Sequence, residues 1–318
     1  MLAPRIWLAA LGAGTLLLSC GTPRFLERYT TAEAASLAGD WPRAAELWHE
    51  VYLSEDPKTP RPILETANAL YQAGDSESAC GMLDQGLQLF PYDVELLEYK
   101  GMLLERCGYQ RAAESIYARL VAVSPDHVAA LSALARLRLG LGLERAAEEP
   151  LQHLVKIGRA DAVVYEQLAE VQLVRGRPLN ALESYGKAIE LGSDDPVVLL
   201  TAAQLACEPG VTERYESSES CALDWLTKLV DAYPQYTTGH YRRGELLARL
   251  GRMEEAKQAL RRAVETDPSH LQALVQLVRL HAADGEADPA RALASRALEL
   301  QPDSAVRADR EQLVAELD

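Results

Sequence analysis

Apolar and polar residues follow a helical spacing along most of this chain, and residues 237–270 show the pattern most clearly. Apolar or small side chains recur three or four positions apart in two segments, which Gly251 and Arg252 separate. This spacing is typical of amphipathic helices that bury one face. Gly251 favours a helix end because glycine tolerates the left-handed conformation, and Pro268 ends the second segment because proline cannot continue a helix. The pattern therefore predicts a helix hairpin.

The same hairpin pattern recurs along the chain. Because one hairpin of this size cannot bury its apolar face alone, repeated hairpins must stack on one another. We therefore predict an all-α solenoid in which Gly244 and Ala256 are small because two helices approach closely there. In seven repeats an alanine follows five residues after a glycine, whereas after Gly210 the alanine is delayed to Ala222. The repeat glycines stand at steps of 35, 34, 34, 34, 34, 41 and 34 residues: Gly39, Gly74, Gly108, Gly142, Gly176, Gly210, Gly251 and Gly285.

Two further positions complete a recognisable motif. Pro91, Pro125, Pro234, Pro268 and Pro302 close five repeats, and Arg159 and Ser193 stand at that place in two others. A small residue at the eighth position of six repeats reads Ala67, Gly101, Ala135, Ala169, Ala203 and Gly244.

This pattern resembles the tetratricopeptide repeat family over roughly residues 25–304. The resemblance implies a right-handed α-solenoid of eight helix hairpins. The polar stretch from Cys207 to Cys221, rich in Gly, Pro and Ser, predicts an exposed inserted loop at 208–220 within the sixth unit. The expected units are 25–59, 60–93, 94–127, 128–161, 162–195, 196–236, 237–270 and 271–304, followed by a capping helix at 305–318.

The first nineteen residues predict a signal peptide. Arg5 precedes an apolar run from Ile6 to Leu18, which is too short to span a bilayer as a mature helix. The run ends Leu17-Leu18-Ser19-Cys20, which resembles the bacterial lipoprotein box. The resemblance implies removal of 1–19, lipidation of Cys20 and a short tether at 20–24. A plain secretory signal with an incidental cysteine is the alternative.

The same segment predicts where in the cell the protein is located. Residue 21 is glycine and not aspartate, which in lipoproteins of cells with two membranes favours the outer one. We therefore expect a lipid-anchored protein of the bacterial cell envelope, on the periplasmic face of the outer membrane.

Cysteine usage agrees with export. Besides Cys20 the chain has four cysteines, an even number that permits disulfides in an exported protein. Cys207 and Cys221 bracket the insertion, and Cys80 and Cys107 lie at helix ends that should meet. We predict the pairs Cys80–Cys107 and Cys207–Cys221; the alternative is four buried thiols.

Charge and motif spacing exclude several functions. The formal net charge is −15, so the surface repels nucleic acid and anionic head groups. The six histidines lie in different units, and no zinc-ligand spacing, Gly-rich phosphate loop or nucleophile elbow occurs. We therefore expect no catalytic residues, metal, cofactor, small-molecule substrate or nucleic-acid partner, and no enzyme activity.

The family resemblance also implies a working surface. In tetratricopeptide solenoids the first helix of each hairpin lines a concave groove that binds peptides. Carboxylates at these positions, including Glu95, favour a basic partner segment; ordinary exposed helix is the alternative for each residue. The groove candidates are Tyr29, Glu33, Arg61, Asn68, Tyr71, Glu98, Met102, Glu105, Arg136, Glu166, Glu170, Tyr241, Glu245 and Arg279.

The expected function is that of a membrane-anchored scaffold that holds envelope proteins or peptides. Similar lipoproteins assist the assembly of a pilus, secretion or other outer-membrane complex. The alternative is an adaptor that docks peptidoglycan-remodelling enzymes. The sequence contains no motif that separates the two.

Overall fold

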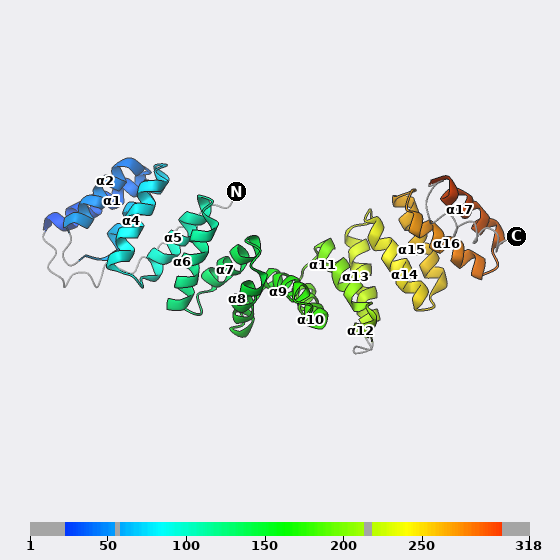
Figure 1. Ribbon diagram of the computed structural model, residues 1–318. Coiled ribbons are helices and arrows are strands. Elements are labelled where there is room, and N and C mark those ends of the chain that lie inside the picture. Colours follow the sequence, from blue (N-terminus) through cyan, green and yellow to red (C-terminus); the bar gives the residue numbers. More distant parts are fainter. Residues whose placement is uncertain (1–22, 55–57, 213–217, 301–318) are drawn as a thin grey trace. The chain divides into compact units, whose positions relative to one another are not determined.

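The computed structural model describes residues 23–54, 58–212 and 218–300, and within them it contains seventeen helices and no strand (Figure 1). The predicted all-α solenoid is therefore confirmed. Residues 1–19, Cys20 and the predicted cap at 305–318 lie outside the described residues. The first helix already starts at Pro23, inside the predicted tether. None of the described helices is long and apolar enough to cross a membrane.

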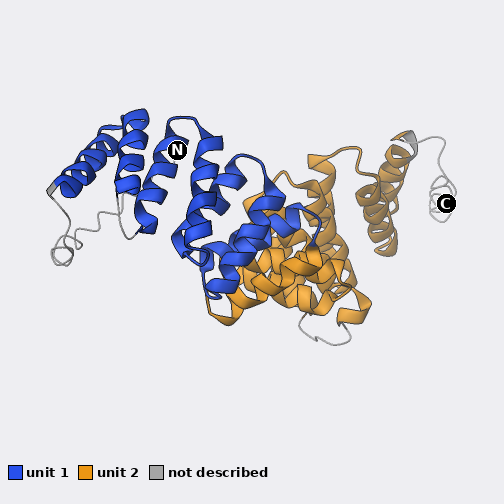
Figure 2. Ribbon diagram, turned by 60° about the vertical axis from the view of Figure 1, so that its left-hand side comes forward, with its two compact units in different colours: residues 1–143 blue, residues 144–318 orange. Residues whose placement is uncertain are grey.

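The helices divide between two compact units, residues 1–143 and 144–318 (Figure 2). Unit 1 contains α1 Pro23–Ala38, α2 Trp41–Ser54, α3 Pro60–Gln72, α4 Ser76–Leu89, α5 Val94–Arg106, α6 Gln110–Val123 and α7 Val128–Gly140. Unit 2 contains α8 Glu144–Lys156, α9 Ala162–Val174, α10 Pro178–Glu190, α11 Pro196–Ala206, α12 Pro209–Thr212, α13 Ser218–Ala232, α14 Thr237–Arg249, α15 Met253–Thr266, α16 Leu271–Ala283 and α17 Ala287–Leu300.

Within each unit a helix packs against the helices that precede and follow it. First helices of successive hairpins also touch one another, as α3 touches α5 and α14 touches α16. This arrangement brings side chains from different repeats onto one face.

The turn inside seven hairpins of the described residues is built around a glycine. Gly74 has φ +93°, and its N–H donates to the carbonyl of Tyr71 at 3.0 Å. The N–H of Asp75 donates to the carbonyl of Leu70 at 2.9 Å, which completes a Schellman cap. Six further repeat glycines also have positive φ: Gly39, Gly108, Gly142, Gly176, Gly251 and Gly285.

Gly210 is the exception, and its expected equivalence to the other repeat glycines is wrong. It lies inside the short helix α12, and α11 has already ended at Ala206 with Cys207 as its C-cap. In two other hairpins a glycine ends the second helix, at the place where most repeats have a proline. Gly158, with φ +68°, and Gly192, with φ +103°, end α8 and α10 in the two repeats that lack the closing proline.

Small residues occur where helices approach closely, as predicted for the seventh hairpin. A Cβ added at Gly244 would lie 2.6 Å from Cγ of Leu260 and 3.2 Å from the backbone oxygen of Ala256. Ala256 and Leu260 are both fully buried. A Cβ at Gly101 would likewise lie 2.8 Å from the ring of Tyr117.

The insertion is only partly the exposed loop that its composition predicted. Residues 209–212 form α12, and Val211, 1 % exposed, packs into the apolar core of unit 2. Ser218 at the start of α13 is buried as well. The prediction is therefore wrong at these positions, because the insertion has an aliphatic side chain that reaches the core. Residues 213–217 lie outside the described residues.

The four cysteines in the described residues are free, so neither predicted disulfide is present. Cys80 and Cys107 do pack against the same core, in agreement with the expected meeting of helix ends. Cys207 is the C-cap of α11. Cys221 lies within α13, and Cys207 faces α14, where Arg249 hydrogen-bonds to its carbonyl oxygen and its side chain.

Candidate functional site: the first-helix face

The groove candidates lie on the first helices of the hairpins, α1, α3, α5 and α7 in unit 1 and α9, α14 and α16 in unit 2. On α5 the core takes Leu96, Leu97 and Leu103, which are fully buried. Glu98 and Glu105 therefore point away from the core, because they occupy the other side of the same helix. We call the side chains at these positions the first-helix face.

Aromatic, amide and cationic side chains join neighbouring helices of this face in unit 1. The guanidinium of Arg61 on α3 lies 5.9 Å from the ring centre of Tyr29 on α1. The guanidinium of Arg106 on α5 lies 5.8 Å from the ring centre of Tyr71 on α3. Both distances are within the range of cation–π attraction. Consecutive repeats are thus linked by side chains as well as by the core.

A hydrogen bond adds a third link between α3 and α5. The hydroxyl of Tyr99 donates to Oδ1 of Asn68 at 3.0 Å. Burial raises the pKa of Tyr99 to about 12, so its hydroxyl stays protonated and can donate at neutral pH. Asn68 was predicted to face the groove, whereas its partner Tyr99 was not.

Two carboxylates predicted to attract a basic segment have partners within unit 1. Oε1 of Glu105 lies 2.5 Å from Nη2 of Arg136 on α7. Oε2 of Glu98 lies 3.6 Å from Nε2 of His127, an ion pair when the imidazole is protonated. The first-helix face of unit 1 therefore compensates part of its own negative charge.

Further carboxylates lie near one another on α1, α3 and α5. Burial raises the pKa of Glu65 above its usual value; Arg61 acts in the opposite direction, and Glu33 and Glu95 raise it further. Oε1 of Glu65 lies 3.9 Å from Nε of Arg61. Arg61 therefore serves both Tyr29 and this acidic group.

The carboxylates of α9 in unit 2 have a different environment. Partial burial raises the pKa of Glu170, and the neighbouring charges of Glu166 and Asp195 raise it further. Asp195 is the N-cap of α11, where it accepts from the N–H of Val197. Within the described residues neither Glu166 nor Glu170 has an ion-pair partner. This region therefore keeps an uncompensated negative charge.

Tyr241 on α14 is the centre of an aromatic group. Its ring centre lies 4.9 Å from that of His270 and 5.4 Å from the guanidinium of Arg242. Burial raises the pKa of Tyr241, Glu245 raises it further, and Arg242 and Arg279 lower it. The predicted residues Tyr241, Glu245 and Arg279 are thus close enough to interact.

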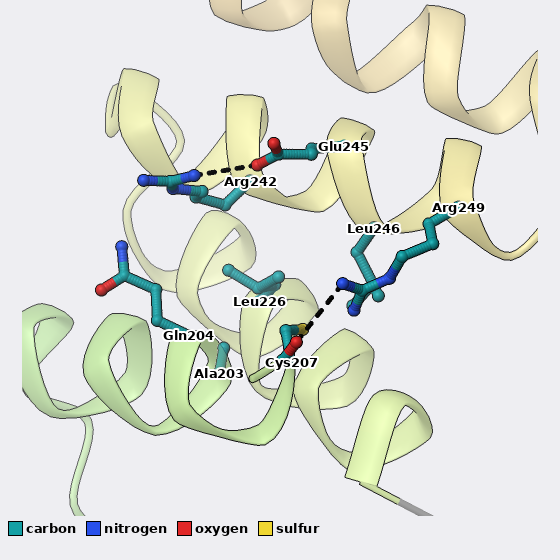
Figure 3. A pocket seen from close by; sticks show the side chains of 8 residues that line it. All are labelled: Ala203, Gln204, Cys207, Leu226, Arg242, Glu245, Leu246 and Arg249. Carbon is teal, nitrogen blue, oxygen red and sulfur yellow. Dashed lines mark hydrogen bonds and ion pairs between the residues drawn. The ribbon is translucent and has the colours of Figure 1, made fainter. Parts of the chain in front are cut away.

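A pocket of about 430 Å³ opens on the same face between α11, α13 and α14 (Figure 3). Its buried lining is apolar and consists of Ala203, Leu226 and Leu246. The other lining residues are Gln204, Cys207, Arg242, Glu245 and Arg249. The volume falls in the usual range of ligand pockets.

The polar residues of this pocket are organised by ion pairs. Nη1 of Arg242 donates to Oε2 of Glu245 at 2.9 Å, and Nε of Arg249 lies 2.9 Å from Oε1 of Glu219. Nη1 of Arg249 also donates to the carbonyl oxygen of Cys207 at 3.4 Å (Figure 3). Nε of Arg242 is buried and has no hydrogen-bond partner among the described residues. The pocket thus combines an apolar base with donors and acceptors.

Sequence reasoning missed the residues that reach this face from outside the groove positions. His127 and His270 are N-caps, and each ring accepts from a backbone N–H three residues later, at 3.2 Å in both cases. Their shared place directly before a first helix was a usable signal. Arg242 gave no such signal, because its motif position does not point into the groove in the family.

No group of three or more histidine, cysteine or acidic side chains in the described ranges is placed to hold a metal ion.

The C-terminal part of the chain matches known family models. Two family models, both described as tetratricopeptide repeat, match residues 222–269 and 247–315. The search among curated proteins found no match of significant similarity.

Two solved structures show the same fold. YrrB, described as a TPR protein with an unusual peptide-binding site, is 16% identical at a TM-score of 0.50 and covers 61% of this chain and 96% of its own. A chain in the structure of Naa15/Naa10 bound to HypK-THB is 18% identical at a TM-score of 0.59. That match covers 89% of this chain and 43% of the other.

Proposed function

Because the chain belongs to the tetratricopeptide repeat family, we propose that it is a membrane-anchored protein–protein interaction scaffold of the bacterial cell envelope. Proteins of this family bind peptides or other proteins and are generally non-catalytic. To this general role the proposal adds a lipid anchor, a location in the cell envelope and the assembly of an outer-membrane complex.

The observation that supports binding is the first-helix face itself. Aromatic, amide and charged side chains from successive repeats lie beside one another, and unit 2 adds a pocket with an apolar base. Such a surface suits a peptide, because apolar side chains need a pocket and the peptide backbone needs donors and acceptors. By analogy with YrrB, which has a similar fold, the partner contributes a peptide segment.

The sequence of residues 1–24 supports the anchor. An apolar run of suitable length for a signal peptide is followed by Ser19 and Cys20, as in lipoproteins. Lipid on Cys20 would attach the protein to the periplasmic face of the outer membrane. From there the scaffold would bring together subunits of a pilus, secretion or other outer-membrane complex.

Crosslinking in intact cells tests this proposal. Wild type and Cys20→Ala are crosslinked side by side, and all proteins joined to the bait are identified by mass spectrometry. One dominant membrane partner that disappears in Cys20→Ala is the expected result. Several soluble wall enzymes that persist without the anchor would instead support an adaptor for peptidoglycan remodelling. Metabolic labelling with a fatty acid analogue, present in wild type and absent in Cys20→Ala, tests the lipid separately.

A further inference from the structure

Unit 2 carries, on the same side, the pocket and a set of carboxylates that we call the acidic group: Glu166, Glu170 and Asp195. Helix α11 connects the two. Asp195 at the N-cap of α11 interacts electrostatically with Glu170 of α9. Ala203 and Gln204, in the second half of α11, line the pocket that α13 and α14 complete. The acidic group and the pocket are therefore separated by little more than the length of one helix.

The pocket has the chemistry to hold an apolar side chain together with its backbone. Leu226 and Leu246 are 2 % and 3 % exposed and form an apolar base. The side chain of Gln204 has no hydrogen-bond partner in the described part of the chain, and Nε of Arg242 has none either. The exposed amide of Gln204 can pair with a peptide carbonyl and N–H, since an amide offers both donor and acceptor.

The charge of the acidic group selects among peptides. In unit 1, Glu98 and Glu105 already have His127 and Arg136 as partners. Glu166 and Glu170 have no such cation in the described ranges, so they can form ion pairs with a cation that a partner supplies. A lysine or arginine meets this requirement, whereas an acidic peptide or a nucleic acid phosphate is repelled.

We propose that unit 2 binds an extended peptide that sets a lysine or arginine against Glu166 and Glu170 and an apolar side chain into the α11–α14 pocket. This inference rests on the proposed scaffold function and names the chemistry of its partner. An extended chain fits, because it presents side chains on alternate sides and can reach both features at once.

Selection from a random peptide display library on the purified full-length protein tests the inference. Enriched peptides are expected to share a basic residue and an aliphatic or aromatic residue. Each is then synthesised, and its affinity is measured by fluorescence anisotropy. The double variant Glu166→Gln, Glu170→Gln should weaken binding about four- to twenty-fivefold, because each of the two exposed ion pairs contributes about a two- to fivefold change.

Two further variants test the pocket by itself and control for the change in net charge. Gln204→Trp places an indole at the pocket entrance from an exposed position, so it should reduce binding without disturbing the core. Glu149→Gln with Glu183→Gln is the matched control. It removes the same charge from exposed positions on the second helices α8 and α10 and should leave the affinity within twofold. Circular dichroism verifies that all variants keep their helix content.

The outcomes distinguish this inference from the broader function. Enriched peptides that keep their affinity in the Glu166→Gln, Glu170→Gln and Gln204→Trp variants bind elsewhere, and this inference is then wrong while the scaffold function stands. Enrichment of peptides with an acidic consensus would contradict the inference in the same way. If no peptide is enriched at all, both the groove-binding function and this inference fail.

Discussion

Replacing Gly244 by alanine should destabilise the seventh hairpin, although alanine is the better helix former. In a helix interior the change from glycine to alanine favours the folded state by about 1 kcal/mol. The new Cβ, however, would lie 2.6 Å from Cγ of Leu260, which is a fully buried branch carbon. It would also lie 3.2 Å from the backbone oxygen of Ala256, so neither neighbour can move freely.

The magnitude follows from these two opposing effects. Forcing an extra methyl group into a packed core costs about 1–3 kcal/mol, and this contact belongs in the upper part of that range. The net destabilisation should therefore be about 1–2 kcal/mol after the helix preference is subtracted. Gly81→Ala is the matched control, because Gly81 is an exposed residue in α4 and no atom lies within 4 Å of its added Cβ. That variant should be more stable by about 0.5–1 kcal/mol.

Amide hydrogen exchange measured by mass spectrometry is the appropriate assay, because repeat proteins open locally and not as a single unit. Peptides from α14 and α15 should exchange about five to thirty times faster in Gly244→Ala than in wild type. Peptides from α4 should exchange more slowly in Gly81→Ala. Slower exchange of α14 and α15 in Gly244→Ala would refute the reasoning, since it would show that the close contact does not constrain the side chain at this position.

Four further predictions concern the buried polar groups, the insertion and the thiols. Glu148→Gln should destabilise α8 and α9 by about 2–3 kcal/mol, because Glu148 is 4 % exposed and its carboxylate pairs with two arginines. Glu149→Gln, at the exposed neighbouring residue, should change stability by less than about 0.5 kcal/mol in the same exchange experiment. A hydrogen bond from His281 and the nearby Lys257 hold the pKa of Glu286 below 4.5 in the folded state, so its contribution is present above that pH and is lost as the pH falls through the folded value. Thermal unfolding followed from pH 6 to 3 should therefore show a smaller acid-induced drop in midpoint for Glu286→Gln than for wild type, and equal drops would contradict this. Val211→Ala should cost about 2 kcal/mol by hydrogen exchange of unit 2, whereas an unchanged stability would mean that α12 is not held by the core. Burial raises the pKa of the Cys207 thiol, so alkylation at pH 8 should be slower in the folded than in the denatured protein, and denatured, non-reduced protein should expose all four thiols of the described residues.

The sequence alone was sufficient for the repeating helix hairpin. Helical spacing of apolar residues and the regular glycines define where chains of this kind fold back, because these are local properties of the backbone. Seven of the eight repeat glycines have positive φ, as their position after a helix requires. The close approach at Gly244 and Ala256 also followed from residue size.

The candidate site was predicted in part. Family register placed Tyr29, Arg61, Glu105 and Arg136 on the first helices, and the structure brings each pair together. Register gives the direction of a side chain relative to its own helix. It does not give the partner that another repeat supplies, which is why Tyr99 and His127 were missed.

Only the tertiary structure decided which charges are compensated and what the insertion does. Glu98 and Glu166 have the same residue type and the same position in their repeats, yet His127 reaches Glu98 while no cation of the described residues reaches Glu166. Val211 looks like one apolar residue in a polar loop, but α12 brings it into the core of unit 2. Cys207 looks like half of a disulfide, but it faces Arg249 on α14. Each outcome depends on contacts between segments far apart in the sequence, and such contacts are settled by how helices stack and not by local backbone preference.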